Sequence, residues 1–334
     1  MSDKFICNTM EKISVIGAGS WGTCLAALLG EKGCDVKLWA RRNELSRKIE
    51  SEKENKQYLP GIKIPNNVIA TSFLEEAVPS SEMIIVAVPS EFFRHVIKGI
   101  RPYHTSQIIL SVTKGIEHHS GKRMSQVIKD EIPKARIAVL SGPNHAEEVS
   151  AKMPAASVVA SKDMRTADAV SEALATPYFK LYRLNDVTGV EICGALKNIT
   201  AIATGVCDGL GFGDNAKASI ITLGLMEMNN YGRHFGAKRG TVYGLAGVGD
   251  LIATCMSKHS RNRFVGENLA KGRKMDEIKK EMHGMVAEGI ATTKAVFEFS
   301  RQNNIGMPLT HQAYEVLFES KDLKQAIKDL LNFV

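Results

Sequence analysis

The residues of this 334-residue chain with the clearest capacity for chemistry lie around Lys197, within the segment GALKN. If the segment is helical, Cys193 and Thr200 lie on or beside the face that carries the lysine, and that face is uncharged. A lysine in this setting either extends its ammonium past the apolar surface into water or directs it into the protein. Burial lowers the pKa of a lysine, so the group can trade a proton. The segment therefore predicts a proton-transfer residue if the side chain points inward.

A second chemical feature is the pair of arginines in SRNR. The pattern predicts a helix over 261–271 with Ser260 as its N-cap, which places Arg261 and Asn262 in the first turn. Cations at a helix N-terminus cost about 0.3 to 1 kcal/mol each. They become favourable if they share an anion with the backbone N–H groups, and a phosphate suits that geometry. The alternative is that the arginines point to solvent.

Two further polar residues follow strand-like runs. Lys114 comes directly after the run at 107–113, and Asn144 follows the run at 136–143, in which Gly142 shapes the turn. Ligands of open α/β sheets bind beyond the carboxyl ends of the strands, so both residues can contact a ligand. Alternatively, Lys114 is an ordinary loop lysine and Asn144 caps the next helix.

Asp250 and Thr254 lie in the segment GLAGVGDLIATC, four residues apart. They share one face if the segment is helical. Asp250 then contributes its carboxylate to the active site or, as the alternative, caps the helix. A carboxylate near Lys197 would raise the lysine pKa, whereas burial and the cation Lys114 would lower it, and the sequence leaves that balance open.

A dinucleotide-binding pattern stands near the N-terminus. The β-branched run at 12–16 leads into GAGSWG, which is followed by a helical run and a second strand-like run at 35–40. In this order Gly17 permits the tight turn, Gly19 lets the backbone approach a pyrophosphate, and Gly22 lets the helix pack on the strand. The helix N-terminus adds a positive dipole. We therefore predict that this turn binds NAD or NADP.

The cofactor preference depends on Arg41 and Arg42, at the end of the second strand-like run. NAD-selective enzymes usually carry an acidic residue there, which binds the ribose 2′-hydroxyl. Two guanidinium groups suit the 2′-phosphate of NADP instead. If both arginines simply face solvent, no preference follows. We therefore favour NADP(H) and keep NAD(H) open.

The rest of the chain predicts two domains. Strand-like runs alternate with helix-like segments, which indicates an α/β domain of Rossmann type with a doubly wound parallel sheet. From Val187 onward long helical patterns replace them, so we place a dinucleotide-binding domain at 1–186 and an all-helical, substrate-binding and catalytic domain at 187–334. The cleft between the domains is the expected active site. Further strand-like runs lie at 68–71, 83–89, 107–113, 136–143, 155–161 and 178–184, and helical patterns at 215–235, 261–271, 288–304, 309–320 and 322–332.

The composition excludes several classes of protein. Lys and Arg number 43 against 36 Asp and Glu, and the net charge of +7 is dispersed without a basic stripe, so a small anionic ligand fits better than nucleic acid. The first ten residues lack the apolar core of a signal peptide, and no uninterrupted apolar run approaches the roughly 18 residues of a membrane span. The six cysteines form no C-x-x-C pair and no ligand cluster with the nine histidines, so we expect a reduced, cytoplasmic protein without a structural metal.

Seven motifs of the chain belong together: GAGSWG at 17–22, TKGI at 113–116, SGP at 141–143, GALKN at 194–198, CDGLGFGDN at 207–215, GVGDLIATC at 247–255 and SRNR at 260–263. Taken together, they closely resemble the soluble, NAD(P)-dependent glycerol-3-phosphate dehydrogenases of the bacterial type. The resemblance runs in register over nearly the whole chain and leaves out only the first ten residues. In that family the reaction interconverts dihydroxyacetone phosphate and sn-glycerol 3-phosphate, which feeds glycerophospholipid synthesis. The GALKN to GFGDN run with SRNR is more specific than the glycine turn, which many dehydrogenases share.

Carried over position by position, the resemblance implies that Lys197 is the catalytic proton donor and acceptor. It also implies that Arg261 and Asn262 bind the substrate phosphate. Asn144 stands where relatives often have serine or threonine, so the detail of that contact departs from the family pattern. The implied substrate contacts are Lys114, Gly142, Asn144, Asn198, Asp250, Thr254, Ser260, Arg261 and Asn262. The implied cofactor contacts, beside Gly17, Gly19 and Gly22 of the glycine turn, are Ser20, Trp21, Arg41, Arg42, Tyr58, Lys114, Ala146, Arg261, Val286 and Glu288.

Two rival interpretations stay open. Dehydrogenases of the 3-hydroxyacid or 6-phosphogluconate type also join a dinucleotide-binding fold to a helical domain with a lysine, but they act on carboxylated substrates. A catalytically silent NADP(H)-binding or redox-sensing protein is the second rival, although sensing needs no proton donor such as Lys197. The oligomeric state is open too, with a homodimer as one option.

Overall fold

The structure, a computed structural model, describes residues 10–118 and 120–332. The chain forms two compact units, one of Met1–Thr113 with Met124–Val187 and the other of Lys114–Arg123 with Thr188–Val334. Segment 114–123 therefore belongs to the second unit, although the chain on either side of it belongs to the first. Residues 1–9 lie outside the described residues. They include Cys7 and most of the N-terminal stretch in which the sequence shows no signal-peptide core.

The first unit begins with the predicted strand, glycine turn, helix and strand. β1 (Lys12–Ile16) leads through the turn into α1 (Ser20–Glu31), and β2 (Asp35–Trp39) returns parallel to β1. All of β1 after Lys12 is buried, because the strand lies inside the sheet with a neighbour on each side. Because both faces of the strand are buried, its sequence is a β-branched run and does not alternate between apolar and solvent-facing polar residues.

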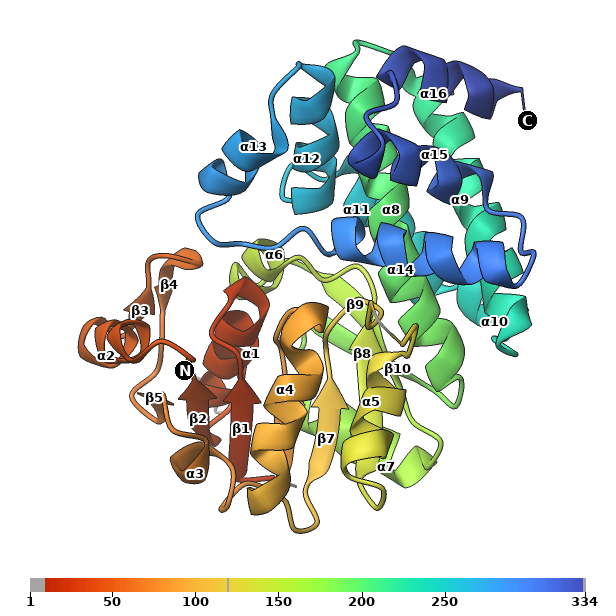
Figure 1. The fold of residues 1–334 in the computed structure, drawn as a ribbon. Helices are drawn as coiled ribbons and strands as arrows, with labels where there is room; N and C mark the ends of the chain where they lie inside the picture. The colour runs from red at the N-terminus through yellow and green to blue at the C-terminus, as the bar shows by residue number, and fades with distance from the viewer. Residues whose placement is uncertain (1–9, 119, 333–334) are drawn as a thin grey trace. The chain divides into compact units, whose positions relative to one another are not determined.

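Eight strands form one sheet (Figure 1). Besides β1 and β2 they are β5 (Val68–Thr71), β6 (Met83–Val86), β7 (Ile108–Ser111), β8 (Arg136–Ser141), β9 (Ala155–Ala160) and β10 (Phe179–Leu184). Their order is β10-β9-β8-β7-β6-β1-β2-β5, so the direction of winding reverses between β1 and β6. Doubly wound sheets bind ligands beyond the carboxyl ends of the strands at such a point. The glycine turn follows β1 at this position.

One junction departs from the predicted all-parallel sheet. β8 and β9 are antiparallel, whereas β9 and β10 pair in parallel. The connection between β8 and β9 contains only α6 (Ala146–Ser150), whose five residues span about 7.5 Å. So short a helix cannot carry the chain back across the sheet, as a parallel crossover requires. The longer α7 (Met164–Leu174) then restores parallel pairing for β10.

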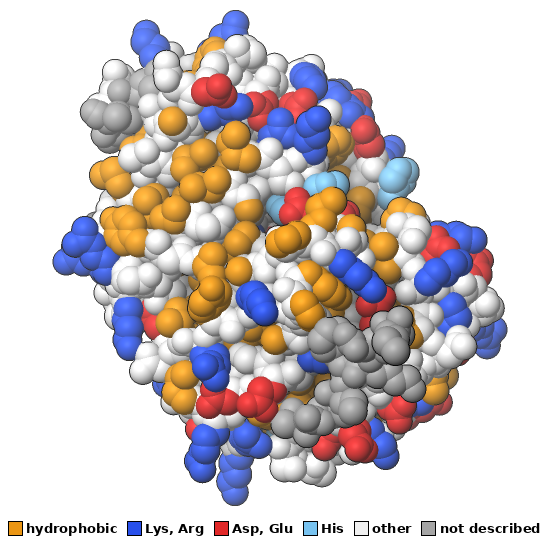
Figure 2. Space-filling view, turned by 180° about the vertical axis from the view of Figure 1, so that it is seen from behind, with side chains coloured by type: hydrophobic (Ala, Val, Ile, Leu, Met, Phe, Trp, Pro, Cys, Tyr) orange, Lys and Arg blue, Asp and Glu red, His pale blue; other side chains and the backbone are white. Residues whose placement is uncertain are grey.

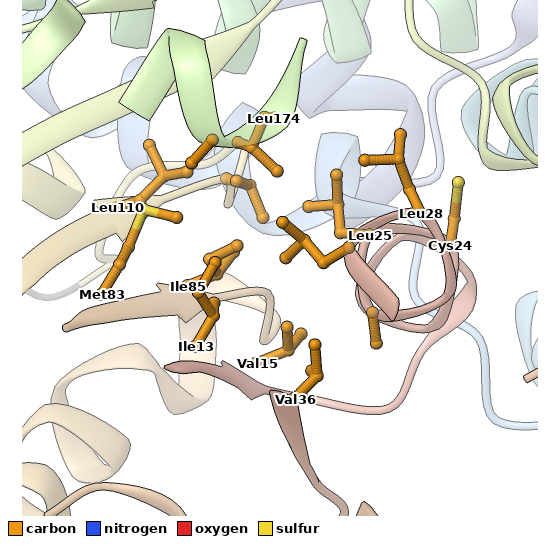
Figure 3. Close-up of a cluster of buried hydrophobic side chains, with 14 of the residues drawn as sticks. Ile13, Val15, Cys24, Leu25, Leu28, Val36, Met83, Ile85, Leu110 and Leu174 are labelled. Carbon is orange, nitrogen blue, oxygen red and sulfur yellow. The ribbon is translucent and has the colours of Figure 1, made fainter. Parts of the chain in front are cut away.

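Apolar cores cover both faces of the sheet. Side chains of β6 alternate between them, because successive residues of a strand point to opposite faces. Met83 and Ile85 belong to the core that includes α1 and α7, which Figure 3 shows with Leu25 of α1. Ile84 and Val86 belong to the opposite core, with α4 and α5. The remaining helices of this unit are α2 (Asn43–Glu52), α3 (Leu74–Ala77), α4 (Ser90–Ile100) and α5 (Met124–Glu131), with a 3-10 turn at Arg101–Tyr103.

A hairpin of β3 (Glu54–Asn55) and β4 (Leu59–Lys63) was not expected from the sequence. It follows α2 and packs beside α1 (Figure 1). β3 has only two residues, and Leu59 is the only buried residue of β4. So short and exposed a hairpin leaves no periodic apolar signal in the sequence.

The second unit is built around α8 (Val187–Gly209). By length and composition α8 could cross a membrane, but its most apolar stretch is entirely buried within the protein, which is the pattern of a core helix. Gly205 and Gly266 allow close packing with α12, since a Cβ on either would lie 2.0 or 1.9 Å from a backbone oxygen of the other helix. The other helices are α9 (Asp214–His234), α10 (Arg239–Val242), α11 (Asp250–Met256), α12 (Arg261–Ala270), α13 (Met275–Glu281), α14 (Glu288–Gln302), α15 (Pro308–Phe318) and α16 (Leu323–Leu331), with a π-helical turn at Leu245–Gly249.

The five helical patterns predicted after Val187 correspond to α9, α12, α14, α15 and α16. In segment 114–123, Ile116 and Arg123 form an isolated antiparallel β-bridge. Ile116 is buried in the core of the second unit, and Arg123 forms an ion pair with Glu191 of α8. These contacts explain why the segment belongs to the helical unit.

Charged residues are mixed on the surface. On the face drawn in Figure 2, Lys and Arg side chains are scattered among Asp and Glu. Exposed pairs such as Lys48 with Glu44 lie one helical turn apart. On this face the basic side chains form no stripe of the kind that nucleic-acid-binding proteins present.

Candidate active site

Lys197 points into the second unit, so the inward alternative is correct. The residue is 5% exposed. Its Nζ donates hydrogen bonds to Asp250 Oδ1 and, over 2.8 Å, to Thr254 Oγ1. Both partners come from α11, which lies against α8 through these bonds. The ammonium is thus held in a fixed position by a buried carboxylate and a hydroxyl.

Asp250 connects two lysines. Its Oδ2 accepts a hydrogen bond from Lys114 Nζ at 3.0 Å, while its Oδ1 accepts from Lys197. Burial by itself would raise the pKa of this carboxyl group, but the ammonium groups of Lys114 and Lys197 outweigh burial and hold the pKa below its usual value. Asp250 is therefore a carboxylate at neutral pH.

The predicted relation of Asp250 to Thr254 is confirmed, since Thr254 Oγ1 donates to Asp250 Oδ1 at 3.2 Å. The capping alternative for Asp250 is wrong. Gly249 occupies the N-cap position of α11, and Asp250 is the first helical residue. Its carboxylate is therefore directed to the lysines and not to the end of its own helix.

Lys114 lies at the start of the inserted segment, with its side chain 17% exposed. Burial lowers the pKa of this lysine to about 7, the nearby Lys197 ammonium adds to the lowering, and Asp250 opposes it. Lys114 can therefore exchange a proton near neutral pH. A loop lysine exposed to water would have no such property.

A chain of amide hydrogen bonds joins this cluster to two further helices. Asn198 Nδ2 donates to the backbone oxygen of Lys114 at 3.1 Å, and Asn262 Nδ2 donates to Asn198 Oδ1 at 2.9 Å. Asn262 Oδ1 accepts from the N–H of Gly289 at 2.9 Å, near the start of α14. These bonds fix the first turns of α12 and α14 relative to the part of α8 that carries Lys197.

The two arginines of SRNR have different surroundings. Ser260 caps α12 as predicted, because its Oγ accepts from the N–H of Arg263 at 3.2 Å. The Arg263 side chain donates to Asp208 at 2.6 Å, so a carboxylate of the protein balances its charge. Arg261 is the first residue of α12 and is half-buried, so its positive charge lies at the helix N-terminus.

The glycine turn in the first unit has the geometry that the sequence predicts. Gly17 has a φ of +119°, and a Cβ at Gly22 would lie 1.8 Å from the Gly17 oxygen. A Cβ at Gly19 would meet no described atom within 4 Å, and α1 has no side-chain cap among the described residues. An open turn whose N–H groups have no side-chain cap fits a pyrophosphate. Ser20 Oγ donates to the backbone oxygen of Tyr58 at 2.6 Å.

Arg41 and Arg42 follow β2 and are both exposed. Arg42 Nη2 donates to Gln57 Oε1 at 2.7 Å and to the Tyr58 hydroxyl at 3.1 Å. The Arg41 guanidinium lies 5.0 Å from the centre of the Phe92 ring. The side chains that could read a 2′-phosphate are thus oriented by neighbours on the hairpin and on α4.

The remaining predicted residues lie in both units. Asn144 is buried and donates to Ser157 Oγ at 2.9 Å, and its capping alternative is wrong because His145 is the N-cap of α6. Gly142, with a φ of +148°, directly follows β8, and Ala146 begins α6. In the second unit, Val286 precedes α14 and Glu288 is its first residue. Trp21 packs edge-on to Phe179, and its buried Nε1 has no hydrogen-bond partner among the described residues.

The structure thus brings together Lys114, Lys197, Asn198, Asp250 and Thr254, with Asn262 bonded to Asn198. Separately it brings together the glycine turn, Tyr58 and Arg42. Sequence reasoning missed Asn55, a buried residue that donates to the Ala18 backbone oxygen in that turn. No glycine or charge pattern marks it. Among the described residues no group of three or more His, Cys, Asp or Glu is placed to hold a metal ion.

Comparisons with known proteins place the chain in a family. Residues 12–167 match the NAD-dependent glycerol-3-phosphate dehydrogenase N-terminus, and residues 186–328 match the C-terminus of the same enzymes. A protein of Chlorobium phaeobacteroides, named glycerol-3-phosphate dehydrogenase (NAD(P)+), is 50% identical over 325 residues, which cover 96% of this chain and 97% of that protein. A protein of the same name from Clostridium tetani is 43% identical over 324 residues, 97% of this chain and 93% of its own. The crystal structure of glycerol-3-phosphate dehydrogenase from Coxiella burnetii is similar with a TM-score of 0.93 and 38% identity, over 96% of this chain and 98% of that one.

Proposed function

The chain belongs to the NAD-dependent glycerol-3-phosphate dehydrogenase family, and from this premise we propose how its residues divide the work of the reaction. The protein is an oxidoreductase that uses NAD or NADP and interconverts dihydroxyacetone phosphate and sn-glycerol 3-phosphate, which supplies glycerophospholipid synthesis. The alternative of a 3-hydroxyacid or 6-phosphogluconate type dehydrogenase has no such support. The observation that carries the residue assignments is the buried cluster of Lys197, Asp250 and Lys114.

Lys197 is the proton donor to the substrate oxygen and the acceptor in the reverse direction. A dinucleotide held at the glycine turn would supply the hydride for the ketone carbon. The carbonyl oxygen then gains negative charge, and Lys197 Nζ gives it the proton that completes the hydroxyl group. Asp250 Oδ1 and Thr254 Oγ1 hold Nζ in one orientation for this transfer.

Lys114 and Asp250 keep the charge of the cluster balanced. When Lys197 gives up its proton, Asp250 still has an ammonium partner in Lys114, through its other oxygen. A buried carboxylate without any partner would be costly, so this arrangement makes the proton transfer easier. Because burial lowers the pKa of Lys114 to about 7, this second lysine can itself exchange a proton under working conditions.

The substrate phosphate is proposed to bind at the start of α12. Arg261 and Asn262 lie in the first turn, which Ser260 caps. Binding energy from the phosphate positions a small ketone that offers few other handles. In the proposal Asn198, Gly142 and Asn144 complete the substrate contacts.

The cofactor is proposed to bind the first unit through the open glycine turn, with Arg41 and Arg42 on the 2′-phosphate of NADP. The pyrophosphate of a dinucleotide requires an anion site at the start of α1, and the uncapped turn fits that requirement. The first unit is then the dinucleotide-binding domain and the helical unit the substrate-binding and catalytic domain. The further cofactor contacts in the proposal are Ser20, Trp21, Tyr58, Lys114, Ala146, Arg261, Val286 and Glu288.

One spectrophotometric assay tests the proposal. The purified protein should oxidise NADPH, and more slowly NADH, when dihydroxyacetone phosphate is present. It should show no turnover with 3-hydroxyacids or 6-phosphogluconate in the opposite direction. Tight NADPH binding without turnover of any ketone would instead revive a silent cofactor-binding protein. A homodimer and a cytoplasmic location remain predictions, which sedimentation and cell fractionation would test.

A further inference from the structure

Asn55, on the hairpin, directs its side chain at the glycine turn. The residue is 1% exposed. Its Nδ2 donates to the Ala18 backbone oxygen at 2.9 Å and to Thr23 Oγ1 at 2.8 Å, and its Oδ1 accepts from the N–H of Tyr58 at 3.3 Å. Both donors of the amide are therefore used on the turn and α1, while the acceptor is used on the hairpin. The side chain is locked between these two elements.

The bond to Ala18 determines how the next peptide group is turned. In a trans peptide the C=O and N–H groups point in opposite directions, and no cis peptide occurs among the described residues. Because the Ala18 oxygen points to Asn55, the N–H of Gly19 points away from the hairpin. Gly19 borders open space, since a Cβ there would meet no described atom within 4 Å. If this peptide rotated, a carbonyl dipole would replace the N–H group at the anion site.

We propose that Asn55 is a positioning residue for the cofactor pyrophosphate, which it never touches. It holds the Ala18–Gly19 peptide so that the Gly19 N–H, with the first N–H groups of α1, faces the anion. This inference rests on the proposed binding of NAD(P) at the glycine turn. It adds to that proposal a residue outside the glycine motif. It also gives a role to the hairpin beside α1, which carries Asn55 (Figure 1).

The hairpin also reaches the arginine that is proposed to read the 2′-phosphate. Tyr58, three residues after Asn55, accepts from Ser20 Oγ through its backbone and from Arg42 through its hydroxyl. The two roles are separable by experiment. The pyrophosphate is common to NADH and NADPH, so losing Asn55 should weaken both, whereas losing Arg42 should weaken NADPH alone.

The test compares two asparagines that both donate two hydrogen bonds in the first unit. Asn55→Leu removes the bonds to the turn. Asn67→Leu is the matched control, because Asn67 Nδ2 donates to the oxygens of Gly30 and Cys34 at the other end of α1, at 2.9 and 2.8 Å. Dissociation constants for NADH and NADPH are measured by fluorescence titration, with circular dichroism and thermal melting as checks of folding.

Asn55→Leu should raise both dissociation constants by the same factor, about tenfold or more, which is the effect of one lost hydrogen bond to a charged group. Asn67→Leu should leave both within about twofold while lowering the melting temperature. If Asn55→Leu does not fold, Asn55→Ser takes its place, since a serine is too short to reach the Ala18 oxygen. Binding by a folded Asn55 variant as tight as wild type, or equal weakening in both variants, would overturn the inference. Wild type that binds neither cofactor would overturn the proposed function as well.

Discussion

Replacing Asp250 with asparagine should destabilise the protein in a way that depends on pH. The substitution keeps the shape of the side chain but removes its charge. Asp250 is 2% exposed and accepts hydrogen bonds from Lys197 and Lys114, so Asp250→Asn leaves two buried cations without their carboxylate. Breaking a buried ion pair by removing one partner costs about 3 to 5 kcal/mol. We expect the free energy of unfolding at pH 6 to fall by about 3 kcal/mol or more on this basis.

The loss should be smaller at high pH. In wild type the pKa of Lys114 is about 7 in the folded protein against an ordinary value of 10.5, so between these values the unfolded chain binds a proton that the folded protein does not. Stability therefore rises with pH across this window. Asp250 raises the pKa of Lys114, so its removal lowers that pKa further and extends the window toward acid. At pH 9 Lys114 is largely neutral in both proteins, and the cost of the substitution should be at least about 1 kcal/mol less than at pH 6.

Urea unfolding at pH 6 and pH 9 measures both quantities. Asp168→Asn is the matched control, because Asp168 pairs with Arg183 at 2.7 Å but both side chains are about half exposed. An exposed pair of this kind contributes about 0 to 1 kcal/mol. A loss below about 1 kcal/mol for Asp250→Asn, or an equal loss at the two pH values, would refute the electrostatic account of the cluster.

Three other predictions concern the cofactor, the phosphate and the C-terminal helices. Arg41→Asp combined with Arg42→Ser should raise KM for NADPH far more than KM for NADH; equal changes would show that the arginines do not select the cofactor. Arg261→Ala should lower kcat/KM for dihydroxyacetone phosphate by a factor that corresponds to about 2 to 5 kcal/mol of lost transition-state stabilisation. The loss should be much smaller for unphosphorylated dihydroxyacetone, and equal losses would remove the role of Arg261 in phosphate binding. Glu227, which is buried and accepts hydrogen bonds from the first N–H groups of α15, should matter for stability. Glu227→Ala should lower the free energy of unfolding in urea by about 2 kcal/mol, and an unchanged midpoint would contradict this capping role.

The sequence predicted most of the fold because the signals are local. Most strands of the large sheet, such as β6 and β9, are short β-branched or apolar runs, and the long helices of the second unit show helical patterns, so both can be read without knowing the rest of the chain. Strand direction between β8 and β9 could not be read in this way. It depends on whether the connection is long enough to cross the sheet, and the five-residue α6 has no distinctive pattern.

Within the candidate site, the shared face of Asp250 and Thr254 was predictable from their four-residue spacing, whereas spacing left the orientation of Lys197 open between solvent and the protein interior. The bridge from Asp250 to Lys114 was not predictable, because it joins residues 136 positions apart in the chain and depends on how segment 114–123 packs. The pairing of Arg263 with Asp208 of α8 was equally hidden, since the two residues lie 55 positions apart in the chain. Such pairings arise from tertiary packing and have no periodic signature.

The central claim is that Lys197 transfers the proton during ketone reduction, and kcat of Lys197→Ala with NADPH and dihydroxyacetone phosphate tests it most directly. Loss of a general acid reduces kcat by roughly a hundredfold or more, whereas the glycine turn that is proposed to bind the cofactor lies in the other unit. We therefore predict a fall of that size in kcat with a dissociation constant for NADPH close to that of wild type. A kcat near the wild-type value in the folded variant would contradict the account.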